Sequence, residues 1–440
     1  MAVYEKSKIC VTIHFKSSER GSADMVKTVK LKCGTTLIME KTDYVQSAAL
    51  GIWVKAGAAD ETDDVSGVSH YIEHMMFKGT ENRSAKEIAS DVDKIGGMFN
   101  AFTGKEATCY YIKTLSSNIC KGAEILLDML TGSRFDPDEM DKERKVIFEE
   151  IKMVKDSPDD DVYDTISELV ASGNPLGRSI LGTPESLSAI DRDKLTGYYR
   201  EKYARDSIVV AIAGNFDEKA IAELFEDRLN SLRDKKVTVR TELKPYRQSF
   251  DVKERDIEQT HICLATPSVS MDDSKYYTFV LMNSIFGGSM SSRLFQSIRE
   301  EKGLAYSVCS MNVFSSYWGF FSIYAGVAHD KAEDALEAIR CELDSLREKG
   351  VTDEELSMAK EQVKSSYIFG LENINSRMFS IGKNKLLLGK VYSPEEVLKE
   401  FDSVTREDIL QAAAMIGDYK SYCGAAVTGR MFDLEGLVRG

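Results

Sequence analysis

The sequence predicts an α+β fold made of two homologous domains, each a mainly antiparallel sheet packed with helices. Its 440 residues exceed what one hydrophobic core ordinarily supports and suit two domains of about 200 residues each. Strand-like and helix-like segments recur in a similar order in both halves. A shift of about 215 residues also aligns three separate segments in the same order, which indicates a duplicated unit.

The first half begins with an apolar strand and continues with helices, a strand pair, more helices and a closing strand. Ser84 and Glu87 form a capping box before one helix, and Asp136 and Pro137 begin the longest one. The expected ranges, in order, are 47–57 (strand), 66–77 and 84–97 (helices), 98–103 and 107–114 (strands), 118–130 and 137–155 (helices), and 206–216 (strand).

The second half follows a similar course, with strands expected at 260–268, 304–314 and 317–327. The shift lays "FDPDEMDKERKVIFEEI" over "GVTDEELSMAKEQVKSS", "IDRDKL" over "VTREDI" and "AIAGN" over "AVTGR". The predicted division is an N-terminal extension (1–24), a first α+β domain (25–232), a charged linker (233–250) and a second α+β domain (251–440).

Composition excludes several classes of protein. Hydrophobic residues make up 43% and charged residues 29%, which is ordinary for a folded globular protein. The net charge of −14 leaves no broad basic surface, so we expect no nucleic-acid partner, and solubility explains that charge better than attraction of basic peptides. No signal-peptide core or bilayer-length apolar run is present, so we expect a cytoplasmic protein without membrane contact.

The segment "GVSHYIEHMMFKGT" contains two of the chain's five histidines. In a helix, His70 and His74 lie one turn apart, with about 6 Å between their Cβ atoms, so both imidazoles can reach one metal ion. Glu73 lies on nearly the same side and is placed to accept a proton from a water beside that metal. The alternative is an amphipathic helix with two ordinary histidines, although chance produces this spacing in only about half a per cent of such chains.

A catalytic zinc usually takes three protein ligands, so a third is expected elsewhere. On the predicted helix 137–155, Glu143, Ile147, Glu150 and Val154 form one stripe that mixes acidic with apolar residues. Glu150 is the favoured third ligand. Glu149, about 100° around the helix, is the competing choice, and an ordinary exposed charge at Glu150 is the other alternative.

The second half lacks this set of residues. At the 215-residue shift, Glu143 and Glu150 correspond to Met358 and Ser365, and the histidine motif falls on "SIFGGSM". We therefore expect one half to perform chemistry and the other to provide a companion surface.

These residues resemble a known family. His-x-x-Glu-His is the inverted zincin motif, and its surroundings are similar to those in pitrilysin-type zinc metallopeptidases, specifically the mitochondrial-processing-peptidase-like branch of short, dimeric chains. The usual pattern is Gly-x-Ala-His-Phe-Leu-Glu-His-Met-x-Phe-Lys-Gly-Thr, and Ser69, Tyr71 and Ile72 occupy variable places. The resemblance continues through "GGMFNAFTGKEATCYY", "VIFEEIKM", "NPLGRSILGTPESL" and "RLFQSIREEKGLAYSV", so it covers most of residues 25–430.

The resemblance implies a role for each matching residue. It implies that one zinc ion is bound per chain, by His70, His74 and Glu150, and that Glu73 is the general base. It further implies that Glu143 supports the site, that Asn100 and Ala101 bind the main chain of an extended peptide, and that Arg299 and Tyr306 contact substrate near the scissile bond. As an alternative, Tyr306 is a strand residue packed in the core.

The resemblance also implies an architecture and an activity. Chains of this type form half of a clam shell and pair around a closed chamber, so we expect a zinc endopeptidase that hydrolyses unfolded peptides. The partner is expected to be a second copy, or else a related chain, with Arg299 and Tyr306 acting across the dimer. The alternative is a non-catalytic or partner-dependent peptide-binding subunit of the same fold.

Overall fold

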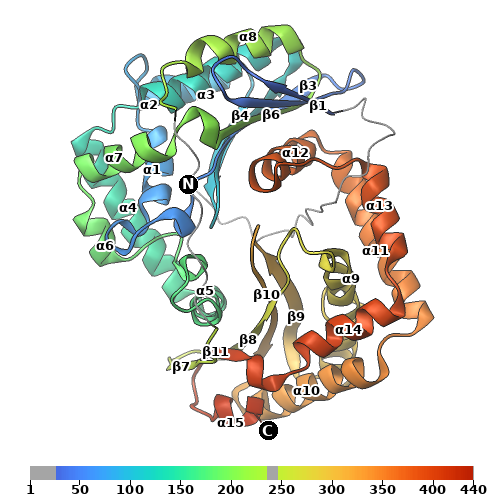
Figure 1. Ribbon diagram of the computed structural model, residues 1–440. Coiled ribbons are helices and arrows are strands. Elements are labelled where there is room, and N and C mark those ends of the chain that lie inside the picture. The colour runs from blue at the N-terminus through green and yellow to red at the C-terminus, as the bar shows by residue number, and fades with distance from the viewer. Residues whose placement is uncertain (1–25, 235–245, 440) are drawn as a thin grey trace.

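The computed structural model describes residues 26–234 and 246–439 (Figure 1). Two β-sheets form its frame. The first has the order β1-β2-β6-β3-β5-β4 and the second the order β7-β11-β8-β10-β9. The strands are β1 (Val26–Lys30), β2 (Thr36–Lys41), β3 (Ser47–Val54), β4 (Met98–Thr103), β5 (Thr108–Leu115), β6 (Ile208–Gly214), β7 (Phe250–Glu254), β8 (Thr260–Ser268), β9 (Ala305–Phe314), β10 (Gly319–Val327) and β11 (Cys423–Thr428).

The two sheets have the same topology once β1 is set aside. In the described part of each sheet, one pair of neighbours is parallel, β2–β6 and β7–β11, and the remaining neighbours are antiparallel. The strands β4 and β9 occupy equivalent edges. This confirms the predicted α+β fold of two homologous, mainly antiparallel domains.

Two helices of the first half, α2 and α4, have the N-terminal caps that the sequence predicts. Ser84 and Glu87 form the expected capping box, and Asp136 accepts hydrogen bonds from the first turn of α4. The helices are α1 (Val68–Met76), α2 (Ala85–Lys94), α3 (Ile119–Gly132), α4 (Pro137–Asp156), α5 (Pro158–Val170), α6 (Pro184–Ala189), α7 (Arg192–Lys202) and α8 (Glu218–Leu229).

The helices of the second half occur in the same order as those of the first half, but their lengths differ. They are α9 (Tyr276–Phe286), α10 (Ala332–Lys349), α11 (Asp353–Leu371), α12 (Ile374–Leu388), α13 (Pro394–Ser403), α14 (Arg406–Ile416) and α15 (Leu434–Arg439), with a π-helix at Phe295–Glu301. Because α9 follows β8 as α1 follows β3, α9 is the counterpart of the histidine helix. A uniform shift of 215 residues therefore places the motif slightly too late, and α9 itself contains no histidine.

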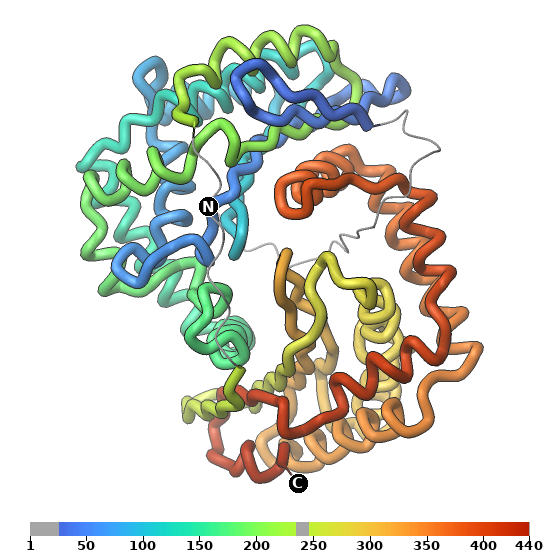
Figure 2. Tube along the Cα trace, in the orientation of Figure 1, coloured from blue at the N-terminus to red at the C-terminus, as the bar shows by residue number. Residues whose placement is uncertain are grey.

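Each half contributes one helix to the other half. The far face of the first sheet is covered by α12, whose Met378 and Ile381 pack with Trp53. The second sheet is covered in the same way by α5, whose Val162 and Ile166 pack with the apolar residues of β8 and β11. In Figures 1 and 2 the orange-red α12 lies under the first sheet, and the green α5 lies beside the second. Each half therefore completes the core of the other.

Ion pairs with at least one buried partner hold both exchanged helices, and the charges on the two helices are opposite. On α12, Arg377 lies 2.8 Å from Glu40 of β2. On α5, Asp161 lies 3.0 Å from Lys253 of β7 and 2.7 Å from Arg255. If either helix packed on the sheet of its own half, like charges would meet. The arrangement therefore favours exchange over self-packing.

The edge hairpins of the two sheets also meet. Glu106, in the turn between β4 and β5, accepts hydrogen bonds from the main-chain N–H of Ser316 (2.7 Å) and from its hydroxyl (2.6 Å). Ser316 lies in the turn between β9 and β10. The predicted extension 1–24 and residues 235–245 of the predicted linker lie outside the described residues. Within the described residues, the helices are too short or too polar to cross a bilayer.

Candidate metal centre

Helix α1 carries both histidines and is almost wholly buried. It packs against α4, and His70 and His74 lie one turn apart, with their ring centroids 4.6 Å from each other. Buried imidazoles need polar partners. The side chains that meet them come from α4.

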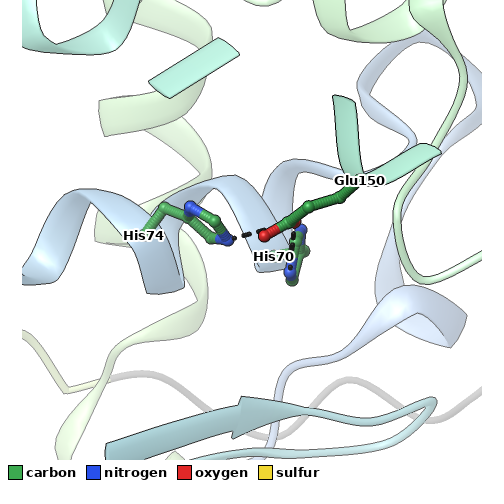
Figure 3. Close-up of side chains that lie close together, drawn as sticks. All are labelled: His70, His74 and Glu150. Carbon is green, nitrogen blue, oxygen red and sulfur yellow. Dashed lines mark ion pairs between the residues drawn. The ribbon is translucent and has the colours of Figure 1, made fainter. Parts of the chain in front are cut away.

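Glu150 of α4 joins the two histidines. Its Oε2 lies 3.8 Å from His70 Nε2 and 3.5 Å from His74 Nε2, and one donor atom of each of the three residues lies within 4.8 Å of the others (Figure 3). The side chain of Glu149 is instead 73% exposed and pairs with Lys152 at 2.7 Å. Of the two glutamates that the sequence leaves open, the structure brings Glu150 to the histidines.

Glu143 holds the other nitrogen of His74. Its Oε2 lies 3.1 Å from His74 Nδ1, and its Oε1 lies 2.6 Å from Lys78 Nζ. An acceptor at Nδ1 orients an imidazole so that Nε2 faces the metal. Lys78 is absent from the predicted set, although its place one turn after His74 is a signal that could have indicated it.

The pKa values of the two histidines shift in opposite directions. Burial, with the adjacent His74 charge, lowers the pKa of His70 to about 4. Burial also opposes the charged form of His74, but hydrogen bonds to Glu143 and Glu150 outweigh it and raise the pKa of His74 to about 9. Although burial opposes it, His74 lowers the pKa of Glu150. Two imidazoles and a carboxylate with one displaceable proton are a donor set that fits zinc.

Glu73 lies beside this group, at one end of strand β4. It is buried, and the hydroxyl of Thr103, the last residue of β4, donates a hydrogen bond to its Oε2. Burial raises the pKa of Glu73. Thr103 is missing from the predicted set because a contact between residues thirty positions apart leaves no local pattern in the sequence.

Strand β4 presents one unpaired edge within the described part of the sheet, because its only neighbour there is β5. Asn100 is exposed and Ala101 is buried, as alternation along a strand requires. The N–H of Ala101 donates to Asn100 Oδ1 at 2.9 Å. The Asn100 side chain therefore occupies a main-chain donor of this strand.

Arg299 and Tyr306 lie together in the second half, on the π-helix and at the start of β9. The Arg299 guanidinium stands 5.4 Å from the centre of the Tyr306 ring and 4.8 Å from that of Phe295. Tyr306 is 75% exposed, which excludes the interpretation that it packs in the core. This pair lies at the β9 edge of the second sheet, whereas the helix that carries the two histidines packs beside the β4 edge of the first sheet.

Family models match both halves of the chain. Residues 36–184 match "Insulinase (Peptidase family M16)", and residues 189–363 match "Peptidase M16 inactive domain". The "Uncharacterized zinc protease YmxG" of Bacillus subtilis is 38% identical over 385 residues, which are 88% of this chain and 94% of that one. The chain belongs to peptidase family M16.

Further relatives agree with this assignment. The "Uncharacterized zinc protease SCO5738" of Streptomyces coelicolor is 37% identical, and the match covers 88% of this M16 chain and 86% of that one. Among solved structures, a protease from Helicobacter pylori has a TM-score of 0.86 at 20% identity, covering 92% of this chain and 99% of that one. A chain of Complex III2 from Candida albicans has a TM-score of 0.79 at 19% identity, covering 91% and 95%. At these identities the solved structures support the fold alone.

Proposed function

We propose that this M16 chain is a zinc endopeptidase that hydrolyses unfolded peptides. The observation that carries the proposal is the convergence of His70, His74 and Glu150, with Glu73 beside them at the end of an edge strand. The names of the relatives as zinc proteases support it. One zinc ion per chain follows from the single group of this kind among the described residues.

In this proposal His70, His74 and Glu150 hold the zinc ion, and Glu143 keeps the His74 ring in place. When bound, zinc acts as a Lewis acid toward the scissile carbonyl. Glu73 accepts the proton of the attacking water and delivers it to the leaving amine. Its raised pKa suits both transfers, because a general base works best when its pKa lies near the operating pH.

The peptide binds as an added strand at the free edge of β4. Asn100 and Ala101 supply main-chain hydrogen bonds, after the Asn100 side chain releases the Ala101 N–H that it now accepts. Because β4 ends at Thr103, which bonds to Glu73, a peptide along this edge runs toward the general base. An enclosed chamber formed by two such chains would exclude folded proteins, so we expect the substrate to be unfolded.

The closed state of the site requires a second chain in this proposal. Each chain forms half of a clam shell, and Arg299 and Tyr306 reach the substrate in the partner's site, which explains why Tyr306 is exposed in a single chain. We propose a homodimer in the cytoplasm, with a related chain as the alternative partner.

A non-catalytic or partner-dependent peptide-binding subunit is the second candidate. The match of residues 189–363 to "Peptidase M16 inactive domain" favours it. A binding subunit has no need for a buried cluster of two histidines and a glutamate, so the peptidase is the better supported function.

Zinc analysis, light scattering and cleavage of a quenched, unstructured peptide test the proposal on the purified chain. A dimer that contains zinc and cleaves the peptide supports it. A zinc-containing chain that is active only with a second, related chain supports the partner-dependent alternative, and one that binds but never cleaves contradicts the peptidase.

A further inference from the structure

Glu61 is a buried carboxylate at the beginning of the histidine helix. It is 3% exposed, and its oxygens accept hydrogen bonds from the main-chain N–H groups of Gly67 (2.7 Å, Oε2) and Ser69 (2.8 Å, Oε1). These N–H groups belong to the first turn of α1, which otherwise has no side-chain cap. Glu61 therefore caps α1 from outside the helix.

The usual solution, a polar residue at the N-cap, is not open to this helix. The N-cap is Gly67, whose φ of +89° is strained for other residues. A Cβ there would lie 2.7 Å from Leu181 O and 2.9 Å from Gly182 Cα, so the loop at 181–182 leaves no room for a side chain. A cap for α1 must come from elsewhere in the chain.

The two zinc-binding histidines differ in how they are held. Glu143 fixes the ring of His74 through Nδ1. The Nδ1 of His70 is buried, and among the described residues it has no hydrogen-bond partner. The position of His70 therefore depends on packing and on the main chain of the first turn, where Ser69, its direct neighbour, is bonded to Glu61.

Burial of Glu61 is costly for a helix cap. The basic groups whose charges act on it, Arg178 and Lys105, form no ion pair with it within 4.0 Å. A buried carboxylate without an ion pair is expensive even when main-chain N–H groups bond it. Asp217, the N-cap of α8, accepts two N–H groups of that helix at its Oδ1, at 2.9 and 3.0 Å, while it remains at the surface. Glu61 therefore caps α1 at a cost that a surface cap such as Asp217 does not have.

We propose that Glu61 is a positioning residue for His70, holding the first turn of α1 so that His70 Nε2 faces Glu150 and the metal. Glu61 fixes the main chain next to His70, whereas Glu143 fixes the ring of His74. The inference rests on the proposed function only in that His70 binds zinc.

Zinc affinity tests it, measured by competition with a chromophoric chelator on the full-length chain. Glu61→Gln weakens zinc binding about 10- to 100-fold, as loss of a residue that orients a ligand does. Asp217→Asn is the control, because it makes the same change from carboxylate to amide at the cap of a helix that carries no ligand. It leaves zinc affinity unchanged. A Glu61→Gln affinity within about twofold of the parent, or an equal loss in Asp217→Asn, overturns the proposal.

A second variant, Glu61→Asp, keeps the proposal testable if Glu61→Gln folds poorly. Glu61→Asp keeps the charge but is too short to reach both N–H groups, and it also weakens zinc binding. Cobalt(II) substitution adds a geometric readout, in which the visible bands change in both Glu61 variants and not in Asp217→Asn. Unchanged bands and affinity in Glu61→Asp contradict the role. If the parent binds zinc and cleaves no peptide, the proposed function fails while this inference stands. If the parent binds no zinc at His70, both the proposed function and this inference fail.

Discussion

Zinc binding at this site should release one proton, from His74. Glu143 and Glu150 raise the pKa of His74 to about 9 in spite of its burial, while burial lowers that of His70 to about 4. At neutral pH the metal-free site therefore holds a charged His74 and a neutral His70. Zinc coordinates only the neutral imidazole, so the proton on His74 must leave.

The magnitude follows from the gap between pH and pKa. Between about pH 5 and pH 9 zinc displaces one proton, so zinc affinity should rise about tenfold per pH unit and level off above pH 9. At pH 7 the apparent affinity should be about 100-fold below this plateau, or roughly 2.7 kcal/mol. Lowering the pH weakens zinc binding because protons compete for His74.

Calorimetry in buffers of different ionisation enthalpy measures this release. The assay is best performed in Glu73→Gln, because the pKa of Glu73 is also raised and that carboxyl can contribute its own proton. We expect one proton per zinc at pH 7. A zinc affinity independent of pH, or a release of two protons in this variant, would refute the assignment of one charged and one neutral histidine.

Three further sets of substitutions probe the site and the contacts that support it. Glu150→Gln should lower zinc affinity more than about 100-fold, whereas Glu149→Gln, one position away, should leave it unchanged in the same chelator assay. Arg377→Ala should lower the free energy of unfolding in urea by about 3–5 kcal/mol, and the charge-reversed double variant Arg377→Glu with Glu40→Lys should recover part of that loss. An equal loss in both variants would show that the ion pair does not stabilise the fold. Thr103→Val should lower kcat about tenfold at constant zinc content, and an unchanged kcat would show that Glu73 needs no support.

Local patterns in the sequence predict much of the site because its key parts are local. The spacing of His70, Glu73 and His74 is a property of one helix, and the start of the helix that carries Glu150 is encoded by Asp136 and Pro137. The helix pattern favours Glu150 and leaves Glu149 as the competing choice, because a stripe on a helix does not say which neighbour it meets. Packing of α4 against α1 decides that.

Contacts between distant segments were beyond the sequence patterns. The hydrogen bond from Thr103 to Glu73 and the cap of Glu61 on α1 depend on how loops and strands pack. The exchange of α5 and α12 was equally hidden, because the apolar face of each helix does not reveal which sheet it covers, and the charges that favour the exchange lie far apart in the sequence. The sequence reveals the duplication because three pairs of elements keep nearly one shift, namely α4 and α11, α7 and α14, and β6 and β11, while other shared elements such as α1 and α9 drift in register.

In the proposed mechanism, Glu73 performs chemistry at a zinc site that it does not help to hold. Zinc content and cleavage of a quenched, unstructured peptide, compared between the parent chain and Glu73→Gln, decide whether this is so. We expect equal zinc in both and cleavage by the parent only. Cleavage by Glu73→Gln at the parent's rate would contradict the assigned general base, and zinc in both with cleavage in neither would contradict a self-sufficient peptidase.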